Sequence, residues 1–315
     1  MEETNSNQEK KQQERQVGTK KSFIKNFNYD KWYKPLLLIP VIILLLSLFY
    51  LGSVYSRTGD FILKDVSLSG GTTITLNGLD IQDTQKLETE LKLQYTDISF
   101  RKLTDMASGK SIAFIIESSE SPESLEASIE KILGYKLTSE NSSIDFSGPV
   151  LSNNFYKQLL IALGISFILM AIVIFILFRT FIPSIAVIFA AFADIVMSLA
   201  LVDYLGIKIS AAGIAAFLML IGYSVDTDIL LTTRAIKKTD GTVNERIFGA
   251  FKTGIFMTLT ALFAVLPAFF IITGLPDSFR QIFLILSIGL FADIFNTWFT
   301  NASIIKWYCD KKGIK

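Results

Sequence analysis

Six runs of about 20 apolar residues constrain this 315-residue chain more than any other feature of its sequence. A helix needs about 20 apolar residues to cross a bilayer, and a backbone inside hydrocarbon must satisfy its own hydrogen bonds. The runs therefore predict a polytopic α-helical membrane protein with six transmembrane helices in a lipid bilayer. They cover residues 36–54, 159–178, 182–202, 209–231, 251–272 and 282–305.

The charge balance and the rare residue types exclude several functional classes. Lys and Arg number 30 against 29 Asp and Glu, and this net charge of +1 excludes a strongly basic nucleic-acid-binding protein. The chain has no histidine and one cysteine, Cys309, which excludes an intrachain disulfide and a multi-cysteine zinc site. The sequence shows no nucleophile–base pair and no cluster of metal ligands. We therefore expect a protein that is not an enzyme and that uses no metal or cofactor.

The distribution of Lys and Arg predicts the orientation, because cytosolic loops of membrane proteins carry an excess of both residues. With the N-terminus in the cytosol, the short outer turns hold only Lys208 and Arg280. The cytosolic segments then hold Arg179, Arg234, Lys237, Lys238, Arg246, Lys252, Lys306, Lys311, Lys312 and Lys315. We expect a multi-pass protein of the cytoplasmic membrane with both termini in the cytosol. The predicted order is a flexible tail at 1–34, a first span at 35–55, an extracytoplasmic domain at 56–155, five spans within 156–306 and a tail at 307–315.

The long external segment has the pattern of a small α+β domain. Alternating apolar residues predict strands at 72–76, 98–103 and 112–116, and a last strand within 136–146. Helices are predicted at 81–94, after the capping residue Asp80, and from Pro122, after Ser121. A turn is expected at Ser108-Gly109. The resulting β-α-β-β-α-β order is typical of a ferredoxin-like domain.

Four carboxylates lie within the apolar runs: Asp194 in the third, Asp226 and Asp228 in the fourth, and Asp293 in the sixth. A charge at the centre of a spanning helix costs about 2.5–3.5 kcal/mol, so such residues need a partner or a function. Because three helices carry them, together with Asn296 in the sixth run, we expect one polar seam inside a helical bundle. The seam is interpreted either as a path for protons or ions, or as hydrogen bonds that only hold the helices together.

Helical geometry separates the polar residues of the fourth run. Thr227 and Arg234 are seven residues apart and share a face, whereas Asp226 and Asp228 point about 100° to either side of Thr227. The two acids are therefore expected to meet different neighbours. Arg234 is included in the seam, although an arginine at such a position is typical of a cytosolic anchor. The polar residues of the sixth run form one stripe: Asp293, Asn296, Thr297 and Thr300.

The chain resembles the SecF family, the smaller membrane partners in the SecD–SecF complexes of the Sec protein-export system. The resemblance spans about residues 35–310. Ser69-Gly70-Gly71-Thr72 resembles the glycine-glycine-threonine motif after the first span, and Gly148-Pro149-Val150 resembles the Gly-Pro element before the second. The most specific match is 221–234, IGYSVDTDILLTTR, which resembles the fourth-span motif and includes Gly222, Tyr223 and Ser224.

The intramembrane acids follow the family only in part. Asp194 and Asp293 occupy positions where the family has third-span and sixth-span aspartates. The bacterial fourth-span motif has Asn-Asp, whereas here Asp226 stands in the place of Asn, Thr227 in that of Asp, and Asp228 follows, as in the archaeal variant. A proton role of the bacterial aspartate therefore does not transfer to one residue. Lys252 stands where the bacterial pattern has Arg, and Arg234 matches the family's arginine.

The resemblance implies that the six helices form half of a twelve-helix core similar to that of resistance–nodulation–division transporters. A SecD-like membrane subunit would supply the other half, and the complex would act with a SecY-type translocon on an unfolded exported polypeptide. Proton flow would move the external domains and promote export. Two other interpretations stay open, namely a stand-alone proton-coupled transporter of a small solute and a non-conducting membrane scaffold.

Overall fold

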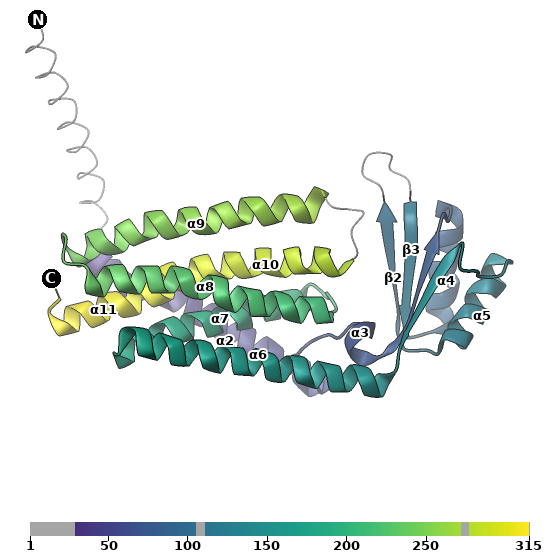
Figure 1. Ribbon diagram of the computed structural model, residues 1–315, viewed down its shortest axis with the longest axis horizontal. Helices are drawn as coiled ribbons and strands as arrows, with labels where there is room; N and C mark the ends of the chain where they lie inside the picture. Colours follow the sequence, from purple (N-terminus) through teal and green to yellow (C-terminus); the bar gives the residue numbers. More distant parts are fainter. Residues whose placement is uncertain (1–28, 105–110, 272–276, 315) are drawn as a thin grey trace, which may run out of the picture.

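The computed structural model describes residues 29–104, 111–271 and 277–314. The chain consists of an elongated helical bundle with a small α/β domain at one end (Figure 1). The two ends of the described chain meet at the opposite end of the bundle, where Lys306 and Asp30 form an ion pair of 2.8 Å. The Asp30 pKa is lowered, first of all by its hydrogen bond with Lys306.

Six helical segments of the described chain are long and apolar enough to cross a membrane, as the six runs predict. They are α2 (Tyr29–Thr58), α6 (Pro149–Phe178), α7 (Phe181–Tyr204), α8 (Ala211–Lys237), α9 (Val243–Ile271) and a sixth segment composed of α10 (Asp277–Phe295), the π-helix η1 (Asn296–Asn301) and α11 (Ala302–Lys312). Several helices extend beyond their apolar runs. The second starts at Pro149 rather than near 159, and α2 includes residues 29–34 of the expected tail. The rest of that tail lies outside the described residues.

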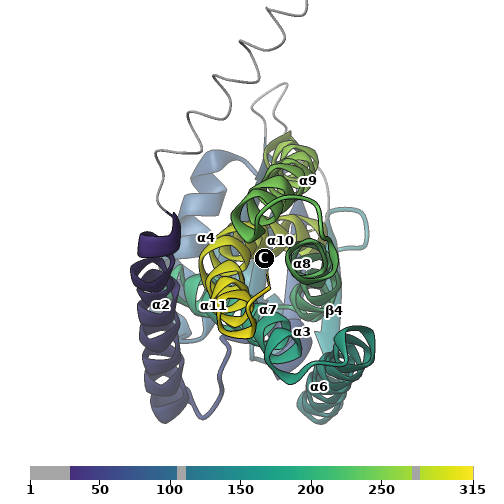
Figure 2. The ribbon, with the colours of Figure 1, turned by 90° about the vertical axis from the view of Figure 1, so that its left-hand side faces the viewer.

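The bundle has a centre and a periphery (Figure 2). Helices α7, α8 and the sixth segment bury about half or more of their span residues, whereas α2, α6 and α9 bury less than a quarter of theirs. Small residues allow close packing at the centre, since a Cβ atom at Gly289 of α10 would overlap the Leu220 side chain of α8. The exposed side chains in the middle of the peripheral helices are mostly large and apolar, as expected of a surface in contact with lipid.

The small domain lies between α2 and α6. Its strands form one antiparallel sheet in the order β2-β3-β1-β4, and the β-α-β-β-α-β element order matches the one expected from the sequence. The turn expected at Ser108-Gly109 lies outside the described residues. The elements are α3 (Val66–Ser69), β1 (Gly71–Asn77), α4 (Ile81–Gln94), β2 (Ile98–Thr104), β3 (Ser111–Ser118), α5 (Pro122–Leu133) and β4 (Ser142–Ser147).

Helices α4 and α5 cover the face of the sheet that is turned away from the bundle (Figure 1). Leu87 and Leu91 of α4, Leu125 and Ile129 of α5 and Phe114 of β3 are fully buried there. Side chains alternate along each strand, and most of those on the opposite face are polar. The row that crosses this face consists of Ser99, Glu117, Thr73 and Asp145.

The domain and the bundle have separate hydrophobic cores. Leu68 of α3 packs with Ile209 and Ile285 in the bundle, whereas Ile74 of β1 belongs to the core of the domain. The boundary between the two cores therefore falls at Gly70 and Gly71, and the domain contacts the bundle through polar groups.

We expect Phe114→Ala to destabilise the domain alone, because its ring is buried only in the domain core. A Phe-to-Ala change in a core costs about 3–5 kcal/mol. Hydrogen exchange followed by mass spectrometry should show faster exchange in β1 and β3 and unchanged exchange in α7 and α8. The matched change Leu220→Ala should have the reverse effect, and loss of protection in both parts from either change would contradict separate cores.

Candidate functional site

Three carboxylates are buried at the centre of the bundle. Asp194 of α7, Asp228 of α8 and Asp293 of α10 are each 0% exposed. Within the described part of the chain, none of the three forms an ion pair with Lys or Arg. Their hydrogen-bond partners are uncharged hydroxyl and amide groups.

Asp194 joins three segments. Its Oδ2 accepts a hydrogen bond from the Ser224 hydroxyl of α8, and its Oδ1 accepts one of 2.7 Å from the Asn296 amide of η1. The third, fourth and sixth spans thus meet at this carboxylate. The sequence analysis expected such a seam from the same three helices.

Asp293 is surrounded by threonine hydroxyls. Thr227 Oγ1 of α8 and Thr297 Oγ1 lie 3.0 and 2.9 Å from Asp293 Oδ1, and Thr258 Oγ1 of α9 lies 3.4 Å from Oδ2. A hydroxyl can donate to a carboxylate and can accept from a protonated carboxyl. The hydrogen bonds around Asp293 can therefore persist in both protonation states.

Asp228 has a less complete set of partners. Its Oδ1 accepts a hydrogen bond of 2.8 Å from the Asn301 amide. Its Oδ2 and the Asn301 Oδ1 are buried, and neither has a hydrogen-bond partner among the described residues. Burial without a partner costs free energy, which makes this the least satisfied part of the cluster.

The π-helix η1 brings the polar residues of the sixth span to one side. All four residues of the predicted stripe are buried, and so is Asn301, which lies eight residues after Asp293 and four after Thr297. The five-residue turn of a π-helix aligns Asn296 with Asn301, so that one reaches Asp194 and the other Asp228. The sequence analysis missed Asn301, and the available signal was an amide inside an apolar run.

Other predicted seam residues lie outside the cluster. Asp226 is exposed on the outer side of α8, beside Gly222, so the two fourth-span acids have different surroundings, as their spacing predicts. Arg234 donates hydrogen bonds of 2.8 and 2.9 Å to the Gly249 carbonyl and the Thr253 hydroxyl of α9. The Tyr223 hydroxyl donates to the Met257 carbonyl, also in α9.

The two motifs that flank the domain meet at its neck, which we define as residues 69–72 and 148–149. A Cβ atom at Gly70 would lie 2.5 Å from Pro149 Cα, and one at Gly71 would overlap the Ser118 carbonyl oxygen. Both glycines have positive φ, +86° and +140°. Only glycine fits these positions, because the chains cross closely and the backbone is in a region unfavourable for L side chains. Thr72 Oγ1 donates to the Glu120 carbonyl at 2.6 Å.

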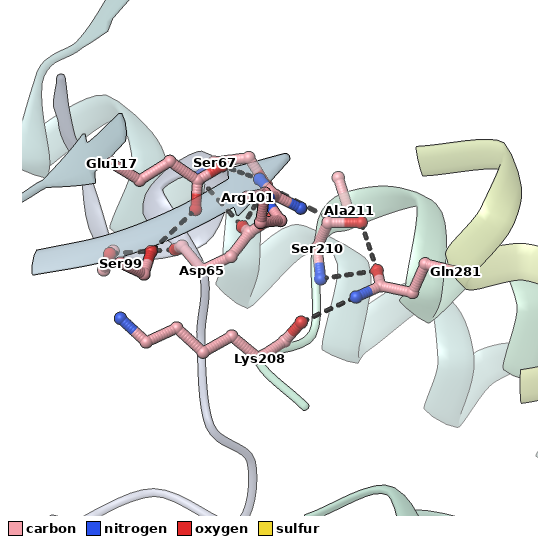
Figure 3. Close-up of polar contacts among 10 residues, drawn as sticks. Asp65, Ser67, Ser99, Arg101, Glu117, Lys208, Ser210, Ala211 and Gln281 are labelled. Carbon is pink, nitrogen blue, oxygen red and sulfur yellow. Dashed lines mark hydrogen bonds and ion pairs between the residues drawn. The ribbon is translucent and has the colours of Figure 1, made fainter. Parts of the chain in front are cut away.

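The segment that leads into the neck, residues 65–67, is bonded to the acid-bearing helices through the turn before α8 (Figure 3). The turn pairs with the chain before α3, since Asp65 N donates to Ile209 O at 3.1 Å. Ala211 N, at the start of α8, donates to Ser67 Oγ at 3.2 Å. Gln281 of α10 donates to Lys208 O at 2.6 Å and accepts from Ser210 N at 2.9 Å. The outer ends of α8 and α10 are thereby fastened to each other and to α3.

A polar cavity of about 290 Å³ separates the sheet from the bundle beside this junction. Its walls include the Arg101–Glu117 ion pair of the sheet, Asp65 and Gln281. Burial raises the pKa of the Asp65 carboxyl. On the far side, Asp97 and Lys208 form an ion pair of 3.2 Å between the domain and the bundle.

We expect Gly71→Ala to destabilise the domain by more than about 2 kcal/mol, because the new methyl group adds an overlap to backbone strain of about 1–2 kcal/mol. Gly78→Ala is the matched control, since Gly78 also has positive φ (+71°) but has open space around its Cβ position. It should cost only the strain. Thermal unfolding of the purified protein, together with hydrogen exchange in β1, measures the stability of both variants. An equal loss of stability in the two variants would contradict the close approach of Gly71 to the Ser118 carbonyl oxygen.

Fold and site together define the class. It is a helical membrane protein with six candidate spans, an α/β domain with its own core, and buried carboxylates that form no ion pair with a described Lys or Arg. The family model described as "Protein export membrane protein SecD/SecF, C-terminal" matches residues 128–311. The protein-export membrane protein SecF of Methanolacinia petrolearia is 36% identical over 91% of this chain and 99% of that protein. The SecF of Methanocaldococcus jannaschii is 35% identical over 88% and 96% of the two chains. The chain therefore belongs to the SecF family, which confirms the resemblance seen in its motifs.

A solved structure shares the fold. The crystal structure of SecDF, a translocon-associated membrane protein from Thermus thermophilus, matches 90% of this chain with a TM-score of 0.70 and 16% identity. At this identity the likeness shows the fold alone. The present chain spans 39% of the SecDF chain.

Proposed function

We propose that this SecF-family subunit promotes protein export across the cytoplasmic membrane by coupling proton entry at its buried acids to movement of its small domain. The observation that carries the proposal is the site of Asp293, a fully buried carboxyl surrounded by hydroxyls from α8, α9 and its own helix, with no cation in contact among the described residues. A SecD-like subunit would complete the membrane core. A SecY-type translocon and an unfolded exported polypeptide would be the other partners.

The chemistry of the cluster supports exchange of a proton. A buried ionised carboxylate without a counter-charge is unfavourable by several kcal/mol, and a proton removes that charge. Protonation also reverses the direction of a hydrogen bond, since the carboxyl then donates where it accepted. At Asp293 such a reversal alters contacts with Thr227 and Thr258, and hence between α8, α9 and α10.

The neck supports transmission of this change to the domain. Helices α8 and α10, which carry acids, meet at Gln281 and Ser210, and α8 contacts α3 through Ser67. Only two crossing chains and polar contacts join the domain to the bundle among the described residues. Small shifts of α8 against α10 can therefore tilt the domain without disturbing either hydrophobic core.

The domain is proposed to be ferredoxin-like and extracytoplasmic. The ferredoxin-like assignment rests on the element order and on the β2-β3-β1-β4 antiparallel sheet. The location rests on the basic residues, because the bundle end away from the domain carries Arg234, Lys237 and the lysines of α11. Both termini are then cytosolic.

A membrane scaffold is the second candidate function. The observation that favours it is that the hydrogen-bond partners of the three buried acids among the described residues are neutral, and that most of them lie on another helix. In that case the acids hold the bundle together and no proton need enter. An Asp-to-Asn substitution distinguishes the two functions, because Asn keeps the hydrogen bonds but cannot take up a proton. A scaffold should therefore tolerate the substitution, whereas proton coupling should not.

We expect Asp293→Asn to slow export at least about fivefold, the lower range of coupling between sites, while the bundle stays folded. Pulse-chase release of a secreted protein should be measured in cells whose own copy is deleted and replaced by Asp194→Asn, Asp226→Asn, Asp228→Asn or Asp293→Asn. Thr260→Val on the exposed side of α9 is the control. Full export activity in all four Asn variants would favour the scaffold over proton coupling.

We expect Gln281→Met to impair export while Asp293 and its hydroxyl partners are unchanged, because methionine has a similar length but cannot bond Lys208 and Ser210. The neighbouring change Arg280→Met is the control, since the Arg280 guanidinium lies over the Phe269 ring, 5.2 Å from its centroid, and bonds neither residue. Export rates and the distance between spin labels on α4 and α9 measure function and domain position. Unchanged values in both assays would contradict transmission through the neck.

A further inference from the structure

A groove of about 410 Å³ runs along the bundle between α2, α7 and α10. The residues that line it lie within 43–50 of α2, 197–204 of α7 and 288–295 of α10. A helix rises about 1.5 Å per residue, so each of these stretches is about 10 Å long. The groove is therefore an elongated hollow parallel to the helices, and it is separate from the buried acids and from the neck.

The groove is open toward the surrounding membrane. Helix α2 lies at the edge of the bundle in the end-on view (Figure 2). The rim of the groove is apolar and exposed, with Leu46 at 63%, Phe291 at 49% and Leu201 at 45%. Its floor is buried and includes Ala200 and Met197, which pack α7 against α2. Apolar hollows exclude water, and folded proteins leave few of them empty, so a hydrocarbon chain is the natural occupant at this depth.

Two tyrosines mark the mouth of the groove. The rings of Tyr50 and Tyr204 are in edge contact, with centroids 5.9 Å apart, and Tyr204 is 72% exposed. Tyrosines in membrane proteins are enriched at the level of the lipid headgroups. The mouth therefore faces the headgroups on the side of the domain, and the groove continues toward Ile43 and Phe295 in the hydrocarbon.

The groove contains a buried hydroxyl without a partner. Ser198 lines it and is 0% exposed, and its Oγ has no hydrogen-bond partner among the described residues. By contrast, the hydroxyls of Ser184 and Ser287 each donate at 2.8 Å to a carbonyl four residues earlier, which is a common arrangement for serine in a helix. Ser198 lies six residues before Tyr204, about 9 Å below the mouth. An acceptor oxygen near the head of a bound chain would satisfy it.

We propose that this groove is a lipid-binding site, which holds one hydrocarbon chain of a membrane lipid from the leaflet on the side of the domain. An oxygen at the head of that chain accepts a hydrogen bond from Ser198, and the apolar walls hold the rest. A flexible chain can enter the groove and reach Ser198, whereas the backbone of a transmembrane helix would rest on the exposed rim at Leu46 and Phe291. The site depends neither on export nor on proton coupling.

The floor of the groove lies next to the acid cluster. The Asn296 amide donates to Met197 Sδ at 3.1 Å and to Asp194 Oδ1 at 2.7 Å. One side chain, Met197, therefore separates a bound lipid from the hydrogen bonds of Asp194. A hydrocarbon chain in the groove packs against Met197 and keeps water away from this side of the cluster.

Native mass spectrometry of the full-length chain, purified in a mild detergent and then washed with a delipidating one, tests the site. The wild-type chain should retain one lipid. Ala200→Phe, which fills the floor, should reduce the retained fraction at least about tenfold, the effect of about 1.4 kcal/mol. Ala162→Phe is the matched control, since Ala162 is exposed on α6 and does not line the groove. It should leave retention unchanged.

A second pair of variants removes a single oxygen atom and leaves the packing intact. Ser198→Ala should reduce retention about fivefold, the effect of one hydrogen bond of about 1 kcal/mol. Ser184→Ala is its control, because Ser184 is equally buried in the same helix but bonds a carbonyl and lies outside the groove. It should retain lipid as the wild-type chain does.

Photolabelling locates the bound chain. The full-length chain is reconstituted in vesicles of glycerolipid with a trace of a lipid that carries a diazirine on its hydrocarbon chain. Labelling mapped by mass spectrometry should be several-fold stronger in 43–50 and 197–204 than in 161–168 of α6, which faces bulk lipid.

Three results would overturn the proposal. The first is a wild-type chain that retains no lipid, or retains it no better than Ala200→Phe and Ser198→Ala. The second is labelling of the groove that is no stronger than labelling of α6, which would indicate bulk lipid only. The third is labelling that disappears when a SecD-family subunit is reconstituted with the chain, which would show that protein covers the groove. All three results leave the proposed role in export untouched.

Discussion

The need to satisfy carboxylates inside an apolar bundle governs the arrangement of its central helices. Asp194 bonds α8 and η1, Asp293 bonds α8 and α9, and Asp228 bonds η1. Loss of one partner would leave a buried polar atom without a hydrogen bond, at a cost of about 1–3 kcal/mol. The helices are therefore held in register with one another, and the proposed proton entry would act on all of them because it changes the charge that they surround. This is the physical basis on which a proton could move four helical segments at once.

Much of this arrangement can be predicted from the sequence, because hydropathy and periodicity report local properties. The six spans follow from apolar runs, and the helices and strands of the domain follow from alternation and capping residues such as Ser121. The separation of Asp226 from Asp228 follows from helical geometry alone. Helix ends were less predictable, since α6 continues into polar sequence as far as Pro149 once it leaves the lipid.

Two features could not be predicted because they depend on contacts between distant parts of the chain. The π-helix changes the phase of the sixth span, so which acid each of Asn296 and Asn301 contacts depends on it, and no periodic pattern in the sequence signals that change. The meeting of Gly70 with Pro149 links residues far apart in sequence. It explains in physical terms why the motif after the first span contains glycines: the two chains must cross where one hydrophobic core ends and the other begins.

The position of Thr227 shows how the cluster accommodates the departure of this sequence from the bacterial motif. Thr227 stands where that motif has an aspartate, and its hydroxyl lies 3.0 Å from Asp293 of the sixth span. Helix α8 therefore contributes a hydroxyl at this point of the seam, and the carboxyl comes from α10. The fourth-span acids are displaced to either side, with Asp228 directed inward to Asn301 and Asp226 outward. In place of the single fourth-span aspartate of the bacterial motif, this chain has two. Asp228 belongs to the buried acid cluster, and Asp226 lies at the surface of the bundle.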